Sequence, residues 1–255
     1  LGPNGAGKTT ALNVLTGLRP ADGGTVSLFG ADPRDAAVRR GLGVTPQDLE
    51  FPAMLRVHEL VDLIRAHYPD PLPTETVLEQ FELVHLRDRY SSALSLGERR
   101  RLAVACAFVG NPRLACLDEP TTGLDVESRL AVWRALRAYV QHGGTVLLTT
   151  HYLEEAEALA SRVVVIGGGV TIFEGSVAEI KARVGVKRVS LWAESLPALL
   201  EADSVAREGE RFVLRTANAD ALLEELRSRG VAFRDLEIQP VTLEEAFLRL
   251  TELAS

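Results

Sequence analysis

The first ten residues, LGPNGAGKTT, carry the clearest chemical pattern in the sequence. Gly2, Gly7, Lys8 and Thr9 fit the spacing G-x-x-x-x-G-K-S/T. Glycines let a backbone fold closely around phosphate because no Cβ stands in the way. The loop N–H groups and the start of a following helix favour an anion, while Lys8 can reach phosphate oxygens and Thr9 can offer a hydroxyl to Mg²⁺. The pattern predicts a phosphate-binding loop in preference to a simple Gly-rich turn.

Two adjacent carboxylates, Asp118 and Glu119, form a second chemical feature. They directly follow the apolar run 114–117, which is typical of a parallel strand buried on both faces. Carboxylates are costly to bury there unless they bind something, and a metal ion and a water molecule are the natural candidates. Open α/β sheets also bind their ligands beyond the carboxyl ends of the strands. We therefore expect this pair to lie in a ligand site.

Two further polar residues follow strand patterns in the same way. Gln47 comes after the short pattern 42–44, and His151 comes after the buried pattern 145–150. Taken alone, each is a weak signal, since an isolated histidine more often caps an element or fills a core. Beside the acidic strand, the functional interpretation of His151 becomes the stronger one.

A helix is expected to begin at Ser95, because Glu98 stands three residues later at the spacing of a capping box. The next residues, Arg99, Arg100 and Arg101, are expected to form a solvated helix face. Taken alone, the serine is therefore explained as a helix cap.

Composition excludes several classes of protein. The net charge of -7 argues against a nucleic-acid partner held by general basicity. No apolar run approaches the roughly 18 residues that a membrane-spanning helix needs. The two cysteines, Cys106 and Cys116, lie in apolar stretches and are expected to be buried free thiols.

The order of patterns predicts an α/β fold with two domains. Residues 1–184 would form the larger domain, interrupted by a helical insertion at about 49–110, and residues 185–255 would form a small α+β domain. Among the other expected elements are a strand at 25–29 and C-terminal helices near 196–201, 219–229 and 243–250.

The ordered set of motifs resembles that of the ATP-binding cassette (ABC) ATPases. The similar segments are GPNGAGKTT at 2–10, Gln47 after a strand, LSLGE at 94–98, LACLDE at 114–119, Gly123-Leu124-Asp125 and His151. Most are modest alone, but the ordered set is specific and covers residues 1 to about 184. The resemblance implies a P-loop NTPase core of the ABC ATPase type, with a helical subdomain insertion and a C-terminal accessory domain.

The resemblance also implies roles for individual residues. The cofactors would be ATP and Mg²⁺. Residues of the loop would bind the nucleotide: Gly2, Pro3, Asn4, Gly5, Ala6, Gly7, Lys8, Thr9 and Thr10. The metal would be held by Thr9, Gln47 and Asp118. The catalytic residues would be Glu119 as general base, His151 at the γ-phosphate and Gln47 as a sensor of the metal and the attacking water. Ser95, Gly97 and Asp125 would complete the ATP site of a second subunit.

The sequence departs from the family pattern in two ways. The signature is Leu-Ser-Leu-Gly-Glu rather than Leu-Ser-Gly-Gly-Gln, so Leu96 replaces a glycine and Glu98 adds a negative charge near a triphosphate. Ser95 and Gly97 are kept, and ATP sandwiching is expected to be retained. Only Leu1 precedes the loop. We expect a strand and an adenine-stacking aromatic residue upstream of it, and weak ATP binding by the chain as printed.

The resemblance thus implies an ATP-binding and ATP-hydrolysing subunit that powers a membrane transporter. A single set of motifs implies a second ATPase subunit, most simply in a homodimer, and the lack of a membrane-spanning run implies a separate membrane permease. The segment 239–248 resembles the end of subunits from bacterial multidrug and antibiotic exporters. We therefore expect an exporter of drugs or other hydrophobic or amphiphilic compounds, with this chain peripheral at the cytoplasmic face of the cell membrane.

Two alternatives remain at this stage. A soluble ABC-type ATPase acting on nucleic acid or the ribosome usually has two cassettes, long coiled-coil insertions or zinc-binding cysteines, and no nucleic-acid partner is expected here. A non-hydrolysing regulatory subunit is favoured only by the altered signature and the short N-terminus. The presence of both Glu119 and His151 speaks against it.

Overall fold

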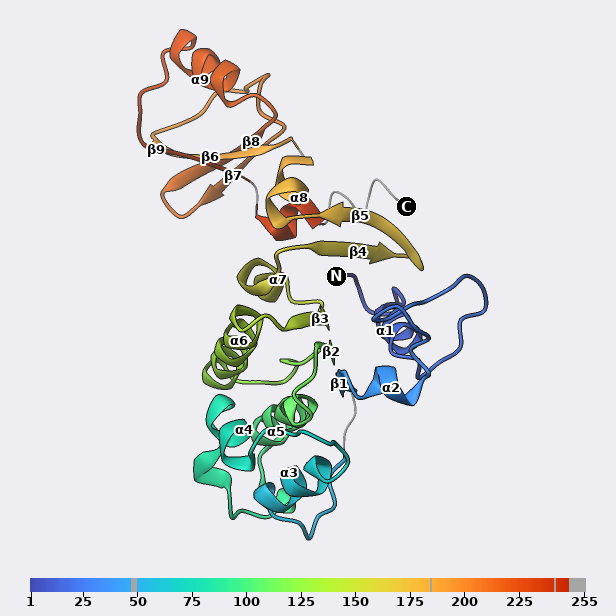
Figure 1. Ribbon diagram of the computed structural model, residues 1–255. Helices are drawn as coiled ribbons and strands as arrows, with labels where there is room; N and C mark the ends of the chain where they lie inside the picture. The colour runs from blue at the N-terminus through green and yellow to red at the C-terminus, as the bar shows by residue number, and fades with distance from the viewer. Residues whose placement is uncertain (47–49, 184, 241, 248–255) are drawn as a thin grey trace. The chain divides into compact units, whose positions relative to one another are not determined.

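The computed structural model describes residues 1–46, 50–183, 185–240 and 242–247. Backbone contacts divide the chain into two compact units, Leu1–Tyr152 and Leu153–Ser255 (Figure 1). The predicted domain boundary after residue 184 is a different division, and it stays a prediction. Gln47, and the last residues of the predicted helix at 243–250, lie outside the described residues.

A parallel three-stranded sheet lies at the centre of the first unit. Its order is β1 (Leu42–Thr45), β2 (Leu114–Asp118) and β3 (Thr145–Thr149). The middle strand is buried from Ala115 to Asp118, as its apolar run predicts. Asp118 is in register with Thr149, since the strands run parallel and end at the same edge of the sheet. That edge therefore brings polar residues of separate segments together.

Helices connect and flank these strands. The first, α1 (Lys8–Leu15), follows the Gly-rich loop and packs near β2 and β3, α2 (Ala36–Arg39) precedes β1, and α6 (Val126–Gln141) joins β2 to β3. The strand expected at 25–29 is wrong. Leu28 and Ala31 form an isolated bridge around Phe29, whose φ of 53° turns the chain back on itself.

The helical insertion is confirmed. It contains α3 (Val57–Arg65), α4 (Thr74–Gln80), the 3₁₀ turns η1 (Val84–Leu86) and η2 (Ser91–Ala93), and α5 (Leu96–Phe108). Apolar residues at helical spacing, among them Val57, Leu60, Val77 and Leu78, are almost completely buried. The ring centroids of Phe81 and Phe108 lie 5.1 Å apart, so aromatic packing joins α5 to the end of α4.

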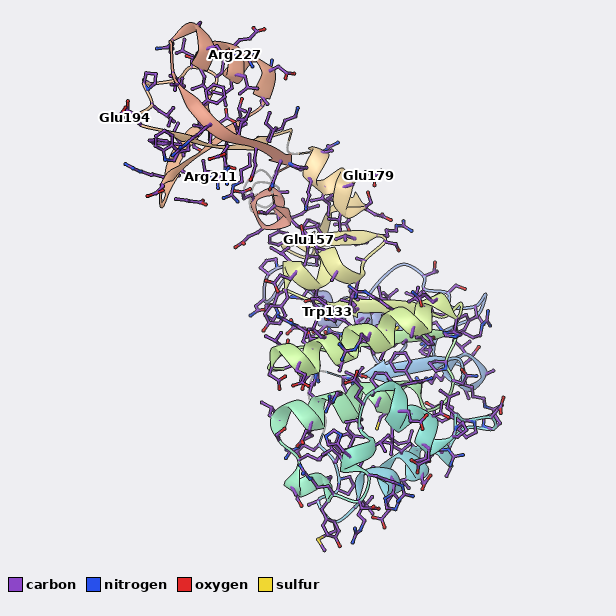
Figure 2. The ribbon with its side chains drawn as sticks, turned by 90° about the vertical axis from the view of Figure 1, so that its left-hand side faces the viewer. Trp133, Glu157, Glu179, Glu194, Arg211 and Arg227 are labelled. Carbon is purple, nitrogen blue, oxygen red and sulfur yellow. The ribbon has the colours of Figure 1, made fainter. Side chains whose placement is uncertain are left out.

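The second unit contains α7 (Leu153–Leu159), the hairpin of β4 (Val163–Gly167) and β5 (Val170–Gly175), and α8 (Val177–Arg183). An antiparallel sheet follows in the order β7 (Ser204–Glu208), β8 (Arg211–Thr216), β6 (Lys187–Ala193) and β9 (Phe233–Pro240). The helix α9 (Ala219–Ser228) buries Leu222 and Leu226 against Val189, Leu191 and Leu214 of the sheet. Figure 2 labels Arg227 on α9, Arg211 on β8, Glu157 on α7 and Glu179 on α8. The α+β character predicted for residues 185–255 is confirmed by this antiparallel sheet and α9.

One predicted helix of the second unit is wrong. Residues 196–201 form no helix, because a side chain of another element binds their backbone. The Glu225 carboxylate of α9 accepts hydrogen bonds from the N–H groups of Leu200 and Glu201, each at 2.9 Å. In the described parts of the chain, no helix combines the length and the apolar character needed to cross a bilayer.

Candidate functional site

The Gly-rich loop leads directly into α1 in a conformation that requires glycine. Gly5 and Gly7 have φ values of 79° and 97°, in the left-handed region that residues with a Cβ rarely adopt. The space that a Cβ would fill at either residue is open. Backbone N–H groups at this end of α1 have no partner within the helix, so the loop presents an accessible set of donors. Its geometry fits the close approach of a phosphate.

Lys8 is the buried cation of this loop, with 6% of its surface exposed. Its ammonium donates to the carbonyl oxygens of Gly2 at 2.8 Å and Pro3 at 3.1 Å. Asn4, Thr9 and Thr10 are exposed beside it. The loop therefore combines one positive charge, held by hydrogen bonds, with several exposed polar groups.

Glu119 lies next to two other predicted site residues, Lys8 of the loop and the predicted catalytic residue His151. Its Oε1 lies 3.6 Å from Lys8 Nζ and 3.1 Å from His151 Nδ1. Its Oε2 accepts a hydrogen bond of 3.2 Å from the Thr122 hydroxyl. The structure thus brings Lys8, Glu119 and His151 together, although they come from three separate segments of the chain.

The environment of Glu119 keeps its carboxyl group ionised. Burial by itself raises the pKa of this carboxyl and is the largest single influence, but the hydrogen bond and charge of His151, the Thr122 hydroxyl and the Lys8 charge together outweigh it. The net result is a pKa below the usual value of glutamate. At neutral pH the side chain is therefore a carboxylate that can accept a proton.

Asp118 occupies the buried end of β2, with only 2% of its surface exposed. It accepts a hydrogen bond from the hydroxyl of Thr149 on β3. The same Thr149 oxygen accepts the backbone N–H of Glu119 at 3.1 Å. Thr149 thus contacts both acidic residues, and the sequence analysis missed it. Its position in the sequence, at the end of the strand pattern that follows the one ending in Asp118, could have indicated this role.

The donor set suits a magnesium ion held together with phosphate. Within the described residues, no group of three or more His, Cys, Asp or Glu side chains could hold a metal ion by itself. Mg²⁺ in nucleotide sites commonly takes one or two carboxylates, with phosphate oxygens and water completing its shell. The Asp118 carboxylate and the Thr9 hydroxyl are oxygen donors of that kind.

The signature segment forms a second group of predicted site residues. Ser95 caps α5 in the predicted box: its Oγ accepts the Glu98 N–H at 3.2 Å, and Glu98 Oε2 accepts the Ser95 N–H at 2.8 Å. Gly97 lies beside Asp125, since a Cβ on Gly97 would be 3.7 Å from Asp125 Oδ2. Asp125 itself caps α6 by accepting the Ser128 N–H at 2.8 Å. Ser95, Gly97 and Asp125 thus form a cluster whose own contacts run to α5 and α6 rather than to the loop.

Two of the arginines expected on a solvated face do not lie on one. Arg101 is 7% exposed. Arg100 donates to the carbonyl oxygens of Pro46 at 3.1 Å and Glu119 at 2.8 Å. The prediction for these two residues is wrong because Arg101 is buried and Arg100 binds main-chain oxygens at the strand ends, which the charged residue types in the sequence do not reveal.

The sequence is similar to a known protein family and to individual proteins of that family. A family model described as "ABC transporter" matches residues 1–122. The daunorubicin resistance ATP-binding protein DrrA3 of Streptomyces coeruleorubidus is 36% identical, over 98% of this chain and 85% of that protein. The Nod factor export ATP-binding protein I of Ralstonia nicotianae is also 36% identical, over 98% of this chain and 84% of that protein. The chain belongs to the ABC transporter family.

Solved structures agree with this assignment of the ABC subunit. The structure of an ATP-binding subunit of an ABC transporter is 27% identical, with a TM-score of 0.63 over 72% of this chain and 80% of that one. A dimeric ATP-binding cassette with bound ADP and Pi is 24% identical, with a TM-score of 0.62 over 69% of this chain and 82% of that one, and supports the fold. The chain is thus an ATP-binding, ATP-hydrolysing subunit that serves a membrane transporter, and its predicted fold class is confirmed.

Proposed function

We propose that this ABC subunit binds Mg²⁺-ATP at the Lys8 loop and hydrolyses it with Glu119 as the general base. The observation that carries this proposal is the position of the Glu119 carboxylate, between Lys8 at 3.6 Å and His151 at 3.1 Å. Phosphoryl transfer depends mainly on positioning and on neutralising charge, with little covalent chemistry for the protein to perform. A cation, a carboxylate and an imidazole at one strand edge meet those needs.

Each residue has a distinct task in this mechanism. The loop N–H groups and the Lys8 ammonium bind the phosphates, with Thr10 on the α-phosphate side, and Lys8 exchanges its loop carbonyl partners for phosphate oxygens. Bound Mg²⁺, held through Asp118, Thr9 and Gln47, would supply charge neutralisation at the phosphates. Glu119 accepts the proton of the attacking water, which its lowered pKa permits at neutral pH. His151 contacts the γ-phosphate side from the end of β3.

The cluster of Ser95, Gly97 and Asp125 completes a site in a second copy of the chain. Its residues cap α5 and α6 and make their contacts with each other and with Ser128, away from Lys8. Gly97 without a side chain leaves room for a phosphate to approach the start of α5, where the helix dipole favours an anion. We propose a homodimer in which each ATP lies between the loop of one subunit and the cluster of the other.

The relatives favour an export function. Their names include daunorubicin or doxorubicin resistance and Nod factor export. We propose that the chain powers export of drugs or other hydrophobic or amphiphilic compounds through a separate permease. It would do so from the cytoplasmic face of the cell membrane.

The variant Glu119→Gln tests the assigned base. It keeps the shape of the side chain but removes the charge that accepts a proton. We expect ATP hydrolysis to fall by about 10²- to 10⁴-fold, while ATP binding, measured by titration, is kept. Glu79→Gln on the exposed face of α4 is the matched control and should hydrolyse ATP normally. A Glu119→Gln protein with the wild-type rate would refute the assignment.

A further inference from the structure

The helix α5 lies in direct backbone contact with the central sheet (Figure 1). At Gly43 of β1, an added Cβ would lie only 1.9 Å from the carbonyl oxygen of Ala107 in α5. The same helix begins at Ser95, the residue proposed to reach the partner's nucleotide. The position of α5 is therefore closely tied to the strands that carry the acidic residues.

Arg100 extends from α5 to the carboxyl ends of two neighbouring strands. One guanidinium nitrogen, Nη1, donates to the Pro46 carbonyl at 3.1 Å, just after β1. The other, Nη2, donates to the carbonyls of Asp118 and Glu119, the latter at 2.8 Å. A planar, always charged guanidinium can hold several acceptors in fixed directions, which a lysine ammonium cannot do.

The backbone of Glu119 needs such support. Its φ of 48° lies in the left-handed region, which is unfavourable for a residue with a Cβ. Its N–H donates to the Thr149 carbonyl at 3.1 Å, and its own carbonyl accepts from Arg100 and from the Thr122 N–H at 3.2 Å. These bonds fix the peptide groups on both sides of the Cα, and so they set the direction in which the carboxylate points.

We infer that Arg100 is a positioning residue for the catalytic base, acting through the backbone carbonyls of Asp118 and Glu119. The inference rests on the proposed role of Glu119. The bonds from Arg100 to Asp118 and Glu119 end on main-chain oxygens, so through them it governs the geometry of the base rather than the chemistry itself. Without it, the left-handed Glu119 loses one of its carbonyl partners and its carboxylate moves away from His151.

The test compares kcat, ATP affinity and folding in Arg100→Gln and Arg100→Lys of the full chain. A misplacement of about 1 Å at a catalytic group costs on the order of 100-fold in rate. We expect Arg100→Gln to lower kcat by about that factor, and Arg100→Lys, which keeps the charge and one donor direction, by about 10-fold. The ATP dissociation constant should stay within about 2-fold in both, since the loop is untouched. Arg99→Gln is the matched control, because in the described part of the chain Arg99 donates to Leu94 of its own segment, at 3.4 Å, rather than to the strand ends.

A double-mutant cycle separates positioning from general stability. If Arg100 acts through Glu119, then Arg100→Gln causes no further loss in a Glu119→Gln background. An equal loss in both backgrounds, or a wild-type kcat in Arg100→Lys and in a folded Arg100→Gln, would overturn the inference. A Glu119→Gln protein with normal hydrolysis would instead show that the assigned base is wrong. The two failures are thus distinguishable.

Discussion

The substitution Gly43→Ala tests how closely α5 packs on the sheet. Gly43 stands in β1, and the added methyl group would lie 1.9 Å from the carbonyl oxygen of Ala107 and 2.9 Å from its carbon. It would also lie 3.0 Å from Cγ of Pro112. The obstacle is mainly backbone within a helix, which cannot rotate away as a flexible side chain could. Either α5 or β1 must therefore move.

The size of that movement follows from the distances. Ordinary contact for a Cβ begins at about 3.4 Å, so the helix must retreat by about 1.5 Å. Extra methyl groups forced into a well-packed core usually cost about 1–3 kcal/mol. Because a whole helix must shift here, we expect a loss of about 2–3 kcal/mol from the free energy of unfolding of the first unit. The same shift of α5 would displace Arg100 from the main-chain oxygens that it binds at the strand ends.

The assay is urea unfolding followed by tryptophan fluorescence. Trp133 lies on α6 of the first unit (Figure 2), and Trp192 lies on β6 of the second. A Trp192→Phe background therefore leaves Trp133 as the reporter of the first unit. Gly23→Ala is the control, since its Cβ would meet nothing within 4 Å and its φ is not positive; it should change the free energy by less than about 1 kcal/mol. A Gly43→Ala protein within about 1 kcal/mol of wild type would refute the close packing.

Two other substitutions test the site and the second unit. In His151→Gln, fewer groups oppose the effect of burial on Glu119, so the pKa of Glu119 should rise. Because the base must be ionised to act, the acid limb of the pH–rate profile for ATP hydrolysis should move to higher pH. An acid limb at the wild-type pH would contradict this. Leu222→Ala removes a fully buried side chain between α9 and its sheet. It should cost about 2–5 kcal/mol in unfolding followed at Trp192, and a change below about 1 kcal/mol would count against that core.

Much of the fold follows from local pattern. The run 114–117 is apolar because β2 is buried, and α5 begins after the capping box predicted at Ser95. Patterns of this kind indicate which residues are buried, because the polarity of each side chain is read directly from its type. The positions of Lys8, Glu119 and His151 could be predicted only through parallel strand order and the resemblance to a family, since no local signal joins them.

The wrong predictions have physical causes that residue types alone do not show. At 25–29 the residue types favour a strand, but Phe29 takes a left-handed φ and folds the chain back. At 196–201 the helix pattern is overridden because Glu225 binds the backbone N–H groups. Arg100 was predicted to be solvated because its acceptors are main-chain carbonyls. Every residue has such a carbonyl, so no residue type in the sequence marks these acceptors. At 196–201 and at Arg100 a tertiary contact decided the outcome, whereas at 25–29 a turn of the backbone did.

We expect the altered signature to act through shape more than through charge. Glu98 was expected to place a negative charge near the triphosphate, but one of its oxygens accepts the Ser95 N–H and the other lies 3.1 Å from Arg89 Nη1. The charge is thus largely compensated within the segment. Leu96, by contrast, is 71% exposed and lies close to Gly123, where an added Cβ would be 3.7 Å from its side chain. An exposed apolar side chain beside Gly97 gains from being covered, so Leu96 should strengthen the proposed subunit contact more than it impedes the phosphate.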